Sequence, residues 1–255
     1  MLVLGIVGSP RKDGRTNQLV GAALEGAASV GAQVQAAYLV DYAIRSFTGS
    51  GGSSQALTYC PAELSALCAQ ADALVVGAPV YYGDINGLTK DFMDTVRIPN
   101  ENGKPALGIS IAGGSGKGLL SGVQSIYHWF YHRQMRAIDP TPVSRFNLAQ
   151  ALEGLRASGA RLAELARHPQ PFPGAGREDR WADVLAHYAT LPYLDRGPVD
   201  EFVLLASQLI AAASGAQAEL ARTELLQALG LLQAGDRAQA GRHAVKAYEL
   251  LYYAG

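Results

Sequence analysis

Short apolar runs alternate with amphipathic segments along the first two thirds of the chain. The apolar runs contain Val, Ile and Ala, as strands buried on both faces of a sheet do, and they cover residues 2–7, 33–39, 73–77, 106–112 and 136–144. Between them, apolar residues recur at helical spacing over residues 18–30, 62–70, 87–96, 119–136 and 148–167. Strands that alternate with helices in this way predict βαβ units with right-handed crossovers, and therefore an α/β fold with a parallel sheet.

Prolines and glycines set the expected limits of these elements. The strand over residues 73–77 is expected to end before Pro79, and residues 136–144 are expected to hold a short edge strand broken by two prolines. A Gly- and Ser-rich stretch within residues 41–59 predicts a mobile loop. In open parallel sheets ligands bind at the carboxyl ends of the strands, so the loops after the first, third and fourth strands are the candidate binding loops.

The character of the sequence changes after residue 167. A Pro/Gly linker precedes four helical segments, which cover residues 179–191, 199–214, 216–234 and 237–252. The last two predict an α-hairpin, with Asp236 as the N-cap of the second helix. We therefore expect a domain over residues 1–167 and a helical C-terminal extension over residues 168–255. The extension either forms an oligomerisation element or folds back on its own domain.

Composition and charge narrow the class of protein. Hydrophobic residues make up 49% of the chain and charged residues 17%, so the chain can fill a core. The net charge is −1 and no Lys/Arg block occurs, so we expect no nucleic-acid partner. The sequence has no apolar run of membrane-spanning length and too few cysteines for a disulfide framework, and we expect no signal peptide. We therefore expect a cytoplasmic protein without a membrane span.

The loop after the first apolar run has the composition of an anion site. Hydroxyl, amide and guanidinium groups come directly before a predicted helix, and they belong to Ser9, Arg11, Arg15, Thr16 and Asn17. A helix N-terminus offers free backbone N–H groups and the positive end of a dipole, so a phosphate group fits there. The dinucleotide-binding motif G-x-G-x-x-G is excluded, because two residues separate Gly5 from Gly8 where the motif has one between its first two glycines. An ordinary polar turn is the alternative, and the loop alone does not identify whose phosphate is bound.

A Gly-rich turn over residues 113–118 follows the fourth predicted strand. Its Gly-Ser-Gly-Lys sequence suggests the phosphate loop of nucleoside triphosphatases, but the spacing excludes that motif. Ile111 stands where the motif requires its first glycine, and Gly118 replaces the required Ser or Thr. Lys117 either approaches a bound cofactor or remains in solvent.

Two sequence motifs resemble those of a known family. Residues 8–16, GSPRKDGRT, resemble the G-S-P-R-x-x-G-N-T loop of the NADPH-dependent FMN reductase family, a flavodoxin-like group. Residues 79–95 resemble that family's second motif, P-V-Y-x-G-x-x-x-G-x-x-K-x-F-x-D-R. The sequence departs from the family at Arg15, where Asn is usual, and at Thr95, where Arg is usual. The resemblance covers roughly residues 1–167 and implies a flavodoxin-like five-stranded parallel sheet with the strand order 2-1-3-4-5.

The resemblance implies that the bound phosphate belongs to FMN. The phosphate would then be held by Ser9, Arg11, Arg15, Thr16 and Asn17. The flavin ring would contact the two later loops, whose candidate residues are Pro79, Val80, Tyr81, Tyr82, Gly83, Gly113, Gly114 and Ser115. The first of these loops supplies flat apolar surface and unshielded backbone, and the glycines of the second allow a close approach. The alternative is that the two tyrosines are simply half-buried loop aromatics.

The family's activity implies a two-step reaction. NADPH or NADH would pass a hydride to flavin N5, and the reduced flavin would then reduce a small-molecule electron acceptor, namely a quinone, a flavin, a nitro or azo compound or a metal ion. The cofactor supplies the reactive atom, so no catalytic side chain is expected. The alternatives are an FMN-binding electron carrier or regulatory flavoprotein without NAD(P)H turnover, and a protein that has lost the flavin and serves in assembly.

Other residues with potential chemistry give weaker signals. Some related flavoproteins carry an iron–sulfur cluster near this position, but Cys60 and Cys68 cannot supply the four thiolates that such a cluster needs. His128 and His132 have a spacing that suits a metal, yet no acid or cysteine nearby completes a site. We therefore expect no bound metal.

Aromatic residues coat the helix predicted over residues 119–136, and they are Tyr127, Trp129, Phe130 and Tyr131. Burial against a second subunit as well as against the sheet would account for this pattern, and we expect a homodimer or homotetramer. A further hypothesis is that aromatic residues of the extension close over a flavin face in a neighbouring chain. These residues are Trp181, Tyr188, Tyr193 and Phe202.

Overall fold

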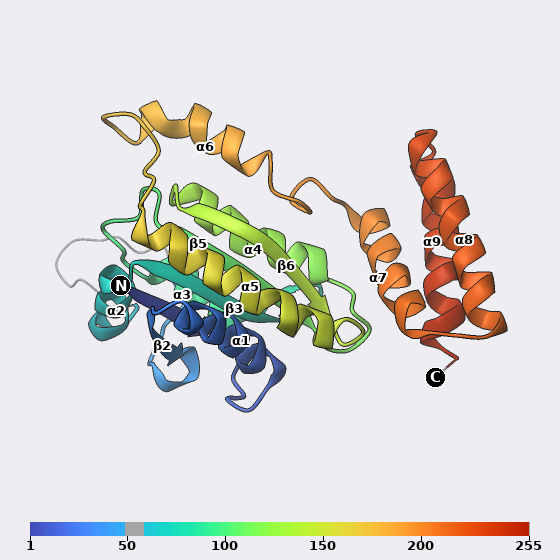
Figure 1. Cartoon of the computed structure of the whole chain (residues 1–255), viewed down its shortest axis with the longest axis horizontal. Coiled ribbons are helices and arrows are strands. Elements are labelled where there is room, and N and C mark those ends of the chain that lie inside the picture. The colour runs from blue at the N-terminus through green and yellow to red at the C-terminus, as the bar shows by residue number, and fades with distance from the viewer. Residues whose placement is uncertain (49–58, 255) are drawn as a thin grey trace.

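A parallel sheet lies at the centre of the structure, a computed structural model that describes residues 1–48 and 59–254 (Figure 1). Its strands are β1 (Leu2–Val7), β2 (Gln33–Tyr38), β3 (Ala73–Tyr81), β4 (Asp84–Ile85), β5 (Pro105–Ala112) and β6 (Arg136–Ser144). The parallel strands follow the order β2-β1-β3-β5-β6, and the short β4 pairs antiparallel with β3. The predicted order 2-1-3-4-5 of the parallel strands is therefore confirmed, and β4 is an addition that the sequence pattern did not reveal.

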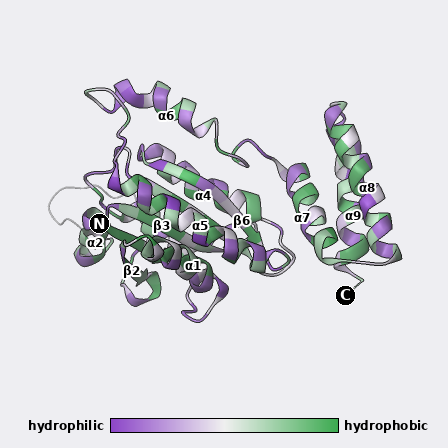
Figure 2. Cartoon of the chain, viewed as in Figure 1, coloured by the Kyte–Doolittle hydropathy of each residue, from purple (hydrophilic) through white to green (hydrophobic). Residues whose placement is uncertain are grey.

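Helices cover both faces of this sheet (Figure 1). One face carries α1 (Arg15–Ser29) and α5 (Leu148–Arg167), and the other carries α2 (Ala62–Gln70), α3 (Gly87–Thr95) and α4 (Leu119–His132). Successive strand residues point to opposite faces, so Leu4 and Ile6 join one core while Val3 and Val7 join the other. Figure 2 shows the central strands coloured mostly as hydrophobic, as expected for a sheet buried on both sides.

Helix α1 begins at Arg15, earlier than the predicted start at residue 18. Its first three residues are polar, so the apolar periodicity that begins at Leu19 does not reveal them. Gly14 precedes the helix in an extended conformation, with φ −77° and ψ 171°. The helix N-terminus therefore lies directly at the polar loop that follows β1. The predicted Gly- and Ser-rich loop falls largely on residues 49–58, which lie outside the described residues.

Strand β3 extends beyond its predicted end. It continues through Pro79 to Tyr81, and Pro79 aligns with Ile111 of β5. The carbonyl oxygen of Gly77 accepts a hydrogen bond from the N–H of Gly8, so the backbone of Gly77 faces β1. The backbone of Pro79, two residues further on, faces the same edge of the strand. The β1 pairing ends at Gly77, and the missing N–H of the proline therefore breaks no ladder bond. The prediction was wrong because it treated proline as a strand breaker regardless of which side of the strand it faces.

Strand β6 is a continuous edge strand of nine residues, not the short, broken one that was predicted. Leu107 aligns with Ile138 and Ile109 with Thr141, so the strand bulges between these two pairs. Asp139 lies at the bulge with a φ of 45°. In the described sheet β6 pairs with β5 alone, and an edge position with a bulge accommodates the prolines at 140 and 142.

Beyond α5, residues 168–177 form no helix or strand, and most of the described chain after them is helical. It forms α6 (Trp181–Tyr188), α7 (Pro198–Ala212), α8 (Ala216–Gln233) and α9 (Arg237–Tyr252). In Figure 1, α6 lies above α4, whereas α7, α8 and α9 form a group beside the sheet. Asp236 is the N-cap of α9, as predicted, and its carboxylate accepts a hydrogen bond from the N–H of Gln239 at 3.0 Å. Within the described residues, no helix has both the length and the apolar character needed to cross a membrane.

Candidate functional site

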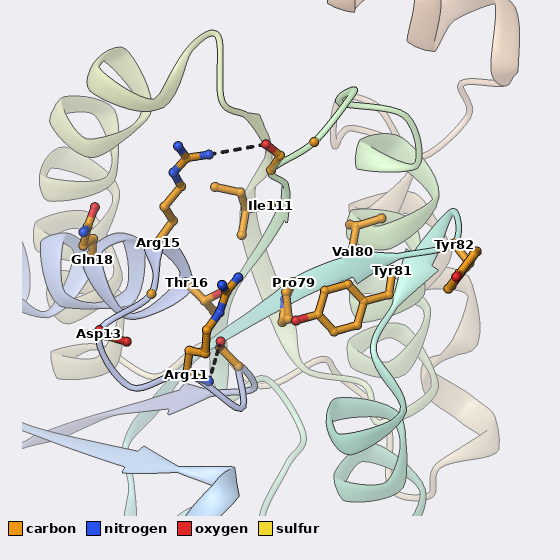
Figure 3. A pocket seen from close by; sticks show the side chains of 14 residues that line it. Arg11, Asp13, Arg15, Thr16, Gln18, Pro79, Val80, Tyr81, Tyr82 and Ile111 are labelled. Atoms are coloured by element: carbon orange, nitrogen blue, oxygen red, sulfur yellow. Dashed lines mark hydrogen bonds between the residues drawn. The ribbon is translucent and has the colours of Figure 1, made fainter.

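The carboxyl ends of β1, β3 and β5 open into one cavity of about 760 Å³ (Figure 3). Its walls come from the three loops that follow these strands. Ten of the thirteen candidate residues line it, namely Ser9, Arg11, Arg15, Thr16, Pro79, Val80, Tyr81, Tyr82, Gly113 and Gly114. Asp13, Gln18 and Ile111 also line it and were not singled out from the sequence. Segments far apart in the chain are thus brought to one place, as the rule for parallel sheets predicts.

The other three candidates, Asn17, Gly83 and Ser115, lie outside this lining. The side-chain oxygen of Asn17 accepts a hydrogen bond from the hydroxyl of Tyr38 at 3.2 Å, so this side chain is directed toward β2. The carbonyl oxygen of Gly83 accepts a hydrogen bond from the hydroxyl of Ser121. The hydroxyl oxygen of Ser115 lies 3.4 Å from the N–H of Lys117, which donates to it. Each of these three groups therefore accepts a hydrogen bond from another residue of the chain.

The N-terminus of α1 faces the cavity with free donors. Within the described chain no side chain caps this helix, and its first turn contains no acidic residue. The first-turn N–H groups therefore lack acceptors inside the helix. Ser9 and Thr16 lie beside them and are only 4% and 3% exposed. Hydroxyls, backbone donors and the positive end of the helix dipole together favour an anion at this position.

Two arginines carry the positive charge of the cavity. Arg11 and Arg15 both extend into it in Figure 3. The guanidinium of Arg15 donates a hydrogen bond to the carbonyl oxygen of Gly113 at 3.4 Å, and this contact joins the first loop to the third. Lys12 is directed elsewhere, because its ammonium group lies 2.7 Å from the carboxylate of Asp41. Arginine can bind a phosphate through two donors at once, so this pair suits such a group.

The turn after β3 places aromatic surface at the rim of the cavity. Tyr81 is 45% exposed and Tyr82 is fully exposed. Tyr82 and Gly83 have φ values of 51° and 89°, and this left-handed pair turns the chain from β3 into β4. A two-residue hairpin turn of this kind requires positive φ at both of its residues, so the turn itself accounts for the conformation of Tyr82.

Two residues that tie the first loop to the second were missed in the sequence. The side-chain amide of Asn86 donates to the carbonyl oxygen of Gly8 at 2.9 Å, and the hydroxyl of Thr89 donates to the Asn86 side-chain oxygen at 2.6 Å. Asn86 is 5% exposed and Thr89 is fully buried. Both occupy variable positions of the second motif, so the motif did not mark them. An Asn at a helix start, followed three residues later by Thr, was the available signal.

Helix α7 supplies an anion to the third loop. The carboxylate of Glu201 accepts hydrogen bonds from the N–H groups of Gly118 at 2.9 Å and Leu120 at 3.0 Å. A nucleoside triphosphatase would offer the N–H groups of such a loop to phosphate, so these contacts agree with the exclusion of that motif. The ammonium group of Lys117 lies over two aromatic rings of the extension, 5.5 and 5.7 Å from their centroids. This lysine is therefore held away from the cavity.

The two cysteines are free and buried below the surface. Burial raises the pKa of both thiols, that of Cys68 to about 12, so both are protonated near neutral pH. His128 and His132 are exposed on α4. Among the described residues, no three His, Cys, Asp or Glu side chains gather into a group that could hold a metal ion.

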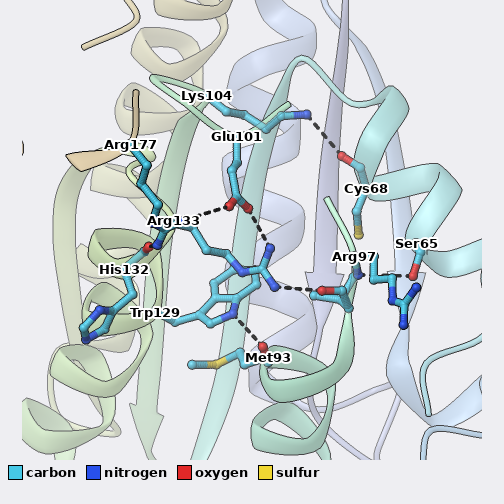
Figure 4. Close-up of polar contacts among 11 residues, drawn as sticks. Ser65, Cys68, Met93, Arg97, Glu101, Lys104, Trp129, His132, Arg133 and Arg177 are labelled. Atoms are coloured by element: carbon cyan, nitrogen blue, oxygen red, sulfur yellow. Dashed lines mark hydrogen bonds and ion pairs between the residues drawn. The ribbon is translucent and has the colours of Figure 1, made fainter. Parts of the chain in front are cut away.

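The aromatic residues of α4 are buried within this chain. The indole N–H of Trp129 donates to the carbonyl oxygen of Met93 at 2.7 Å (Figure 4). The guanidinium of Arg133 lies over the same indole and pairs with Glu101 at 2.6 Å. Tyr127 has no exposed surface. A second subunit is therefore not needed to account for the aromatic pattern, and the oligomeric state stays a prediction.

The aromatic residues of the extension divide into two groups. Trp181 and Tyr188 pack on Tyr131 near the end of α4, with ring centroids 5.3 and 5.4 Å from that of Tyr131. Tyr188 is 7% exposed and its hydroxyl donates to the carbonyl oxygen of Met135 at 2.9 Å, so the structure contradicts its proposed role at a neighbouring flavin. Tyr193 and Phe202 instead join a core cluster beside the third loop of their own chain.

Comparisons with known proteins agree with this fold. The sequence model of a family described as NADPH-dependent FMN reductase matches residues 1–152. An iron–sulfur flavoprotein of Methanocaldococcus jannaschii is 30% identical over 157 residues, which are 55% of this chain and 79% of that protein. Among solved structures, a flavone reductase aligns with a TM-score of 0.54 at 18% identity, over 67% of this chain and 66% of that one. A flavodoxin from the domain Archaea aligns with a TM-score of 0.50 at 19% identity, over 66% of this chain and its own full length.

The flavodoxin-like sheet, the polar loop at its carboxyl edge and the family match define a flavin-dependent oxidoreductase. The chain belongs to the NADPH-dependent FMN reductase family, and FMN and NAD(P)H are the cofactors that this family implies. The name of the Methanocaldococcus relative indicates an iron–sulfur protein. This chain has two cysteines in all, so by itself it lacks a four-cysteine cluster.

Proposed function

We propose that this protein binds FMN in the cavity and uses it to transfer reducing equivalents from NADPH or NADH to a small-molecule acceptor. The acceptor classes are quinones, flavins, nitro or azo compounds and metal ions. One observation carries the proposal: the cavity joins an uncapped helix N-terminus and two guanidinium groups to a wall of apolar and aromatic side chains. The first part suits a phosphate and the second suits a fused aromatic ring. The volume of about 760 Å³ falls in the range of cofactor sites.

The residues after β1 would hold the phosphate. The buried hydroxyls of Ser9 and Thr16 would donate to it, and Arg11 and Arg15 would neutralise its charge. Asn17 would contribute its backbone N–H from the first turn of α1, since its side chain is engaged by Tyr38. Each of these groups is a donor or a cation, as the binding of a dianion requires.

The turns after β3 and β5 would hold the ring. Pro79, Val80 and Tyr81 offer apolar surface, and Gly113 and Gly114 leave the backbone open on the opposite wall. Backbone N–H groups in residues 80–83 and 113–115 would stabilise negative charge on the reduced ring. Bound FMN would supply the atom that accepts the hydride, so the residues of the chain have to bind, orient and polarise, and none is assigned as acid or base.

Titration of the purified full chain with FMN tests the binding step, and steady-state oxidation of NADPH and NADH tests the reaction. We expect one FMN per chain, and FMN-dependent oxidation of a nicotinamide with a quinone or ferricyanide as acceptor. A chain that takes up no FMN contradicts the proposed site. An FMN-loaded chain that oxidises neither nucleotide with any acceptor contradicts the proposed reaction and leaves an electron carrier or a regulatory flavoprotein.

We also propose that residues 1–167 form the FMN-binding domain, that residues 168–255 form its helical extension, and that the protein assembles as a homodimer or homotetramer. The family match over residues 1–152 supports the first part. Exposed apolar side chains on α8 support the assembly, namely Leu220, Leu226 and Leu229. Light scattering after size-exclusion chromatography tests the assembly, and a monomer at micromolar concentration contradicts it.

A further inference from the structure

Side chains of the C-terminal extension hold the third loop of the cavity through its backbone. Glu201, in the first turn of α7, accepts the N–H groups of Gly118 and Leu120, one on each carboxylate oxygen. Tyr248 of α9 donates its hydroxyl to the carbonyl oxygen of Ser115 at 2.8 Å. Three backbone groups within residues 115–120 are therefore bonded to two helices that come much later in the chain.

Close packing accompanies these bonds. A Cβ atom at Gly116 would stand 2.4 Å from the buried side chain of Leu205 on α7. At the end of β6, the hydroxyl of Ser144 donates to the side-chain oxygen of Gln208 at 2.6 Å, and both residues are buried. Buried polar contacts with defined partners favour one relative placement of the packed elements. The extension therefore packs against the carboxyl end of the sheet in one defined orientation.

The loop that the extension holds is also a wall of the cavity. Gly113 and Gly114 line the cavity and directly precede Ser115. Gly118 touches the second loop as well, because a Cβ atom placed there would lie 2.6 Å from the Cα of Gly83. A displacement of residues 115–120 would therefore move both loops that face the ring. The family match ends at residue 152, so these contacts come from a part of the chain outside it.

We infer that the helical extension is a positioning element of the flavin site and that Glu201 is its principal positioning residue. The inference rests on the proposed FMN site. The N-terminus of α4 has no cap from its own residues, and the Glu201 carboxylate supplies the missing acceptors. Glu201 thereby fixes the loop against which the ring binds. The phosphate loop after β1 contacts the third loop at Gly113, through Arg15, outside the residues that Glu201 holds.

This division of roles gives a specific expectation for ligand binding. FMN and riboflavin share the ring and differ in the phosphate. In the full-length protein, Glu201→Ala should raise the Kd of both ligands by the same factor, about tenfold, as expected for the loss of a helix cap. Glu201→Gln keeps one acceptor oxygen and should recover part of this loss. Glu219→Ala removes an exposed glutamate of α8 and serves as the matched control, with both Kd values unchanged.

Hydrogen exchange in the FMN-free protein gives an independent measurement. The amides of Gly118 and Leu120 should lose protection in Glu201→Ala, while the amides of β1 keep theirs. Unchanged Kd values in Glu201→Ala, with wild-type protein that binds FMN, would overturn the inference. A general loss of protection that includes β1 would also overturn it, because Glu201 would then serve overall stability. Wild-type protein that binds neither ligand would instead overturn the proposed function.

Discussion

The side chain of Asn86 donates a hydrogen bond to the carbonyl oxygen of Gly8, although the two residues are 78 positions apart. Gly8 opens the first motif and Asn86 lies inside the second, so the two motifs are parts of one structure. A Cβ atom at Gly8 would stand 1.9 Å from the hydroxyl oxygen of Thr89 and 2.9 Å from the carbonyl oxygen of Gly77. Only glycine fits at this crossing, which explains why the phosphate loop begins with that residue.

Asn86→Ala should loosen this connection and weaken FMN binding. The substitution removes the amide donor to the buried carbonyl oxygen of Gly8 and the acceptor of the Thr89 hydroxyl, and it leaves the longer Thr89–Gly8 contact of 3.4 Å, so we expect the free energy of unfolding to fall by about 1–3 kcal/mol. Urea unfolding and FMN titration measure the two effects. Asn100→Ala, at an exposed asparagine, is the control and should change neither quantity. An Asn86→Ala protein with wild-type stability and wild-type FMN affinity contradicts the proposed connection.

Arg11→Ala and Arg15→Ala should weaken the binding of FMN much more than the binding of riboflavin. Each guanidinium is assigned to the phosphate, and loss of a charge-assisted bond should raise the FMN Kd about tenfold or more. Lys12→Ala is the matched control, because Lys12 pairs with Asp41 and should contribute little. If Arg15→Ala binds FMN as tightly as wild type, Arg15 does not contact the phosphate. Equal losses for FMN and riboflavin would place these arginines at the ring instead.

Neither cysteine should react with a thiol reagent in the folded protein. Cys60 is 5% exposed, Cys68 has no exposed surface, and burial raises the pKa of both thiols. A disulfide reagent such as DTNB at pH 8 should label the native chain slowly, at the rate of unfolding, and label two thiols at once in denaturant. Rapid labelling of the native protein would show that these thiols are accessible and would contradict the buried positions.

His187 should make stability depend on pH. Burial lowers its pKa below the ordinary value of 6.5, and the nearby Arg136 and Arg161 act in the same direction, although its bond to the carbonyl oxygen of Ala137 opposes the shift. Between the folded pKa and 6.5 the unfolded chain binds more protons, so stability from this group is complete above pH 6.5 and is lost as the pH falls. Urea unfolding at pH 7.5 and 5.5 measures the loss.

The matched variant for this prediction is His187→Gln, which keeps a side-chain donor for Ala137 and removes the titrating group. The loss of stability between the two pH values should be smaller in the variant than in the wild type. Equal losses in both proteins would assign the pH dependence to other groups.

The alternation of strands and helices and the polar loop after β1 could be predicted because local patterns carry them, whereas the strand order and the candidate ring-binding loops were implied by the resemblance of two motifs to a known family. Buried runs of Val and Ile, a glycine break and polar residues before a helix are all visible in one stretch of sequence. The contacts of Asn86 with Gly8 and of Glu201 with Gly118 could not be predicted, because each joins segments that only the folded chain brings together. The effect of Pro79 was predicted wrongly for a related reason. Its missing N–H would matter only if β1 still paired with β3 at that position, and the pairing ends at Gly77.

Helix α4 also shows that a sequence pattern does not identify the partners of a buried surface. Its aromatic coat predicted burial against a second subunit as well as the sheet, but the sequence pattern could not say what covers the helix. The covering elements are α3 and α6 of the same chain, through Met93 and Trp181. A hydrophobic pattern indicates that a helix surface is buried, and only the tertiary structure shows which elements bury it.

Anaerobic addition of NADPH, and separately of NADH, to the FMN-loaded protein tests the central claim most directly. The account predicts that at least one nucleotide bleaches the absorbance of the oxidised flavin with one equivalent per FMN, and that a quinone added afterwards restores it. FMN that stays bound and oxidised in the presence of either nucleotide would contradict the account.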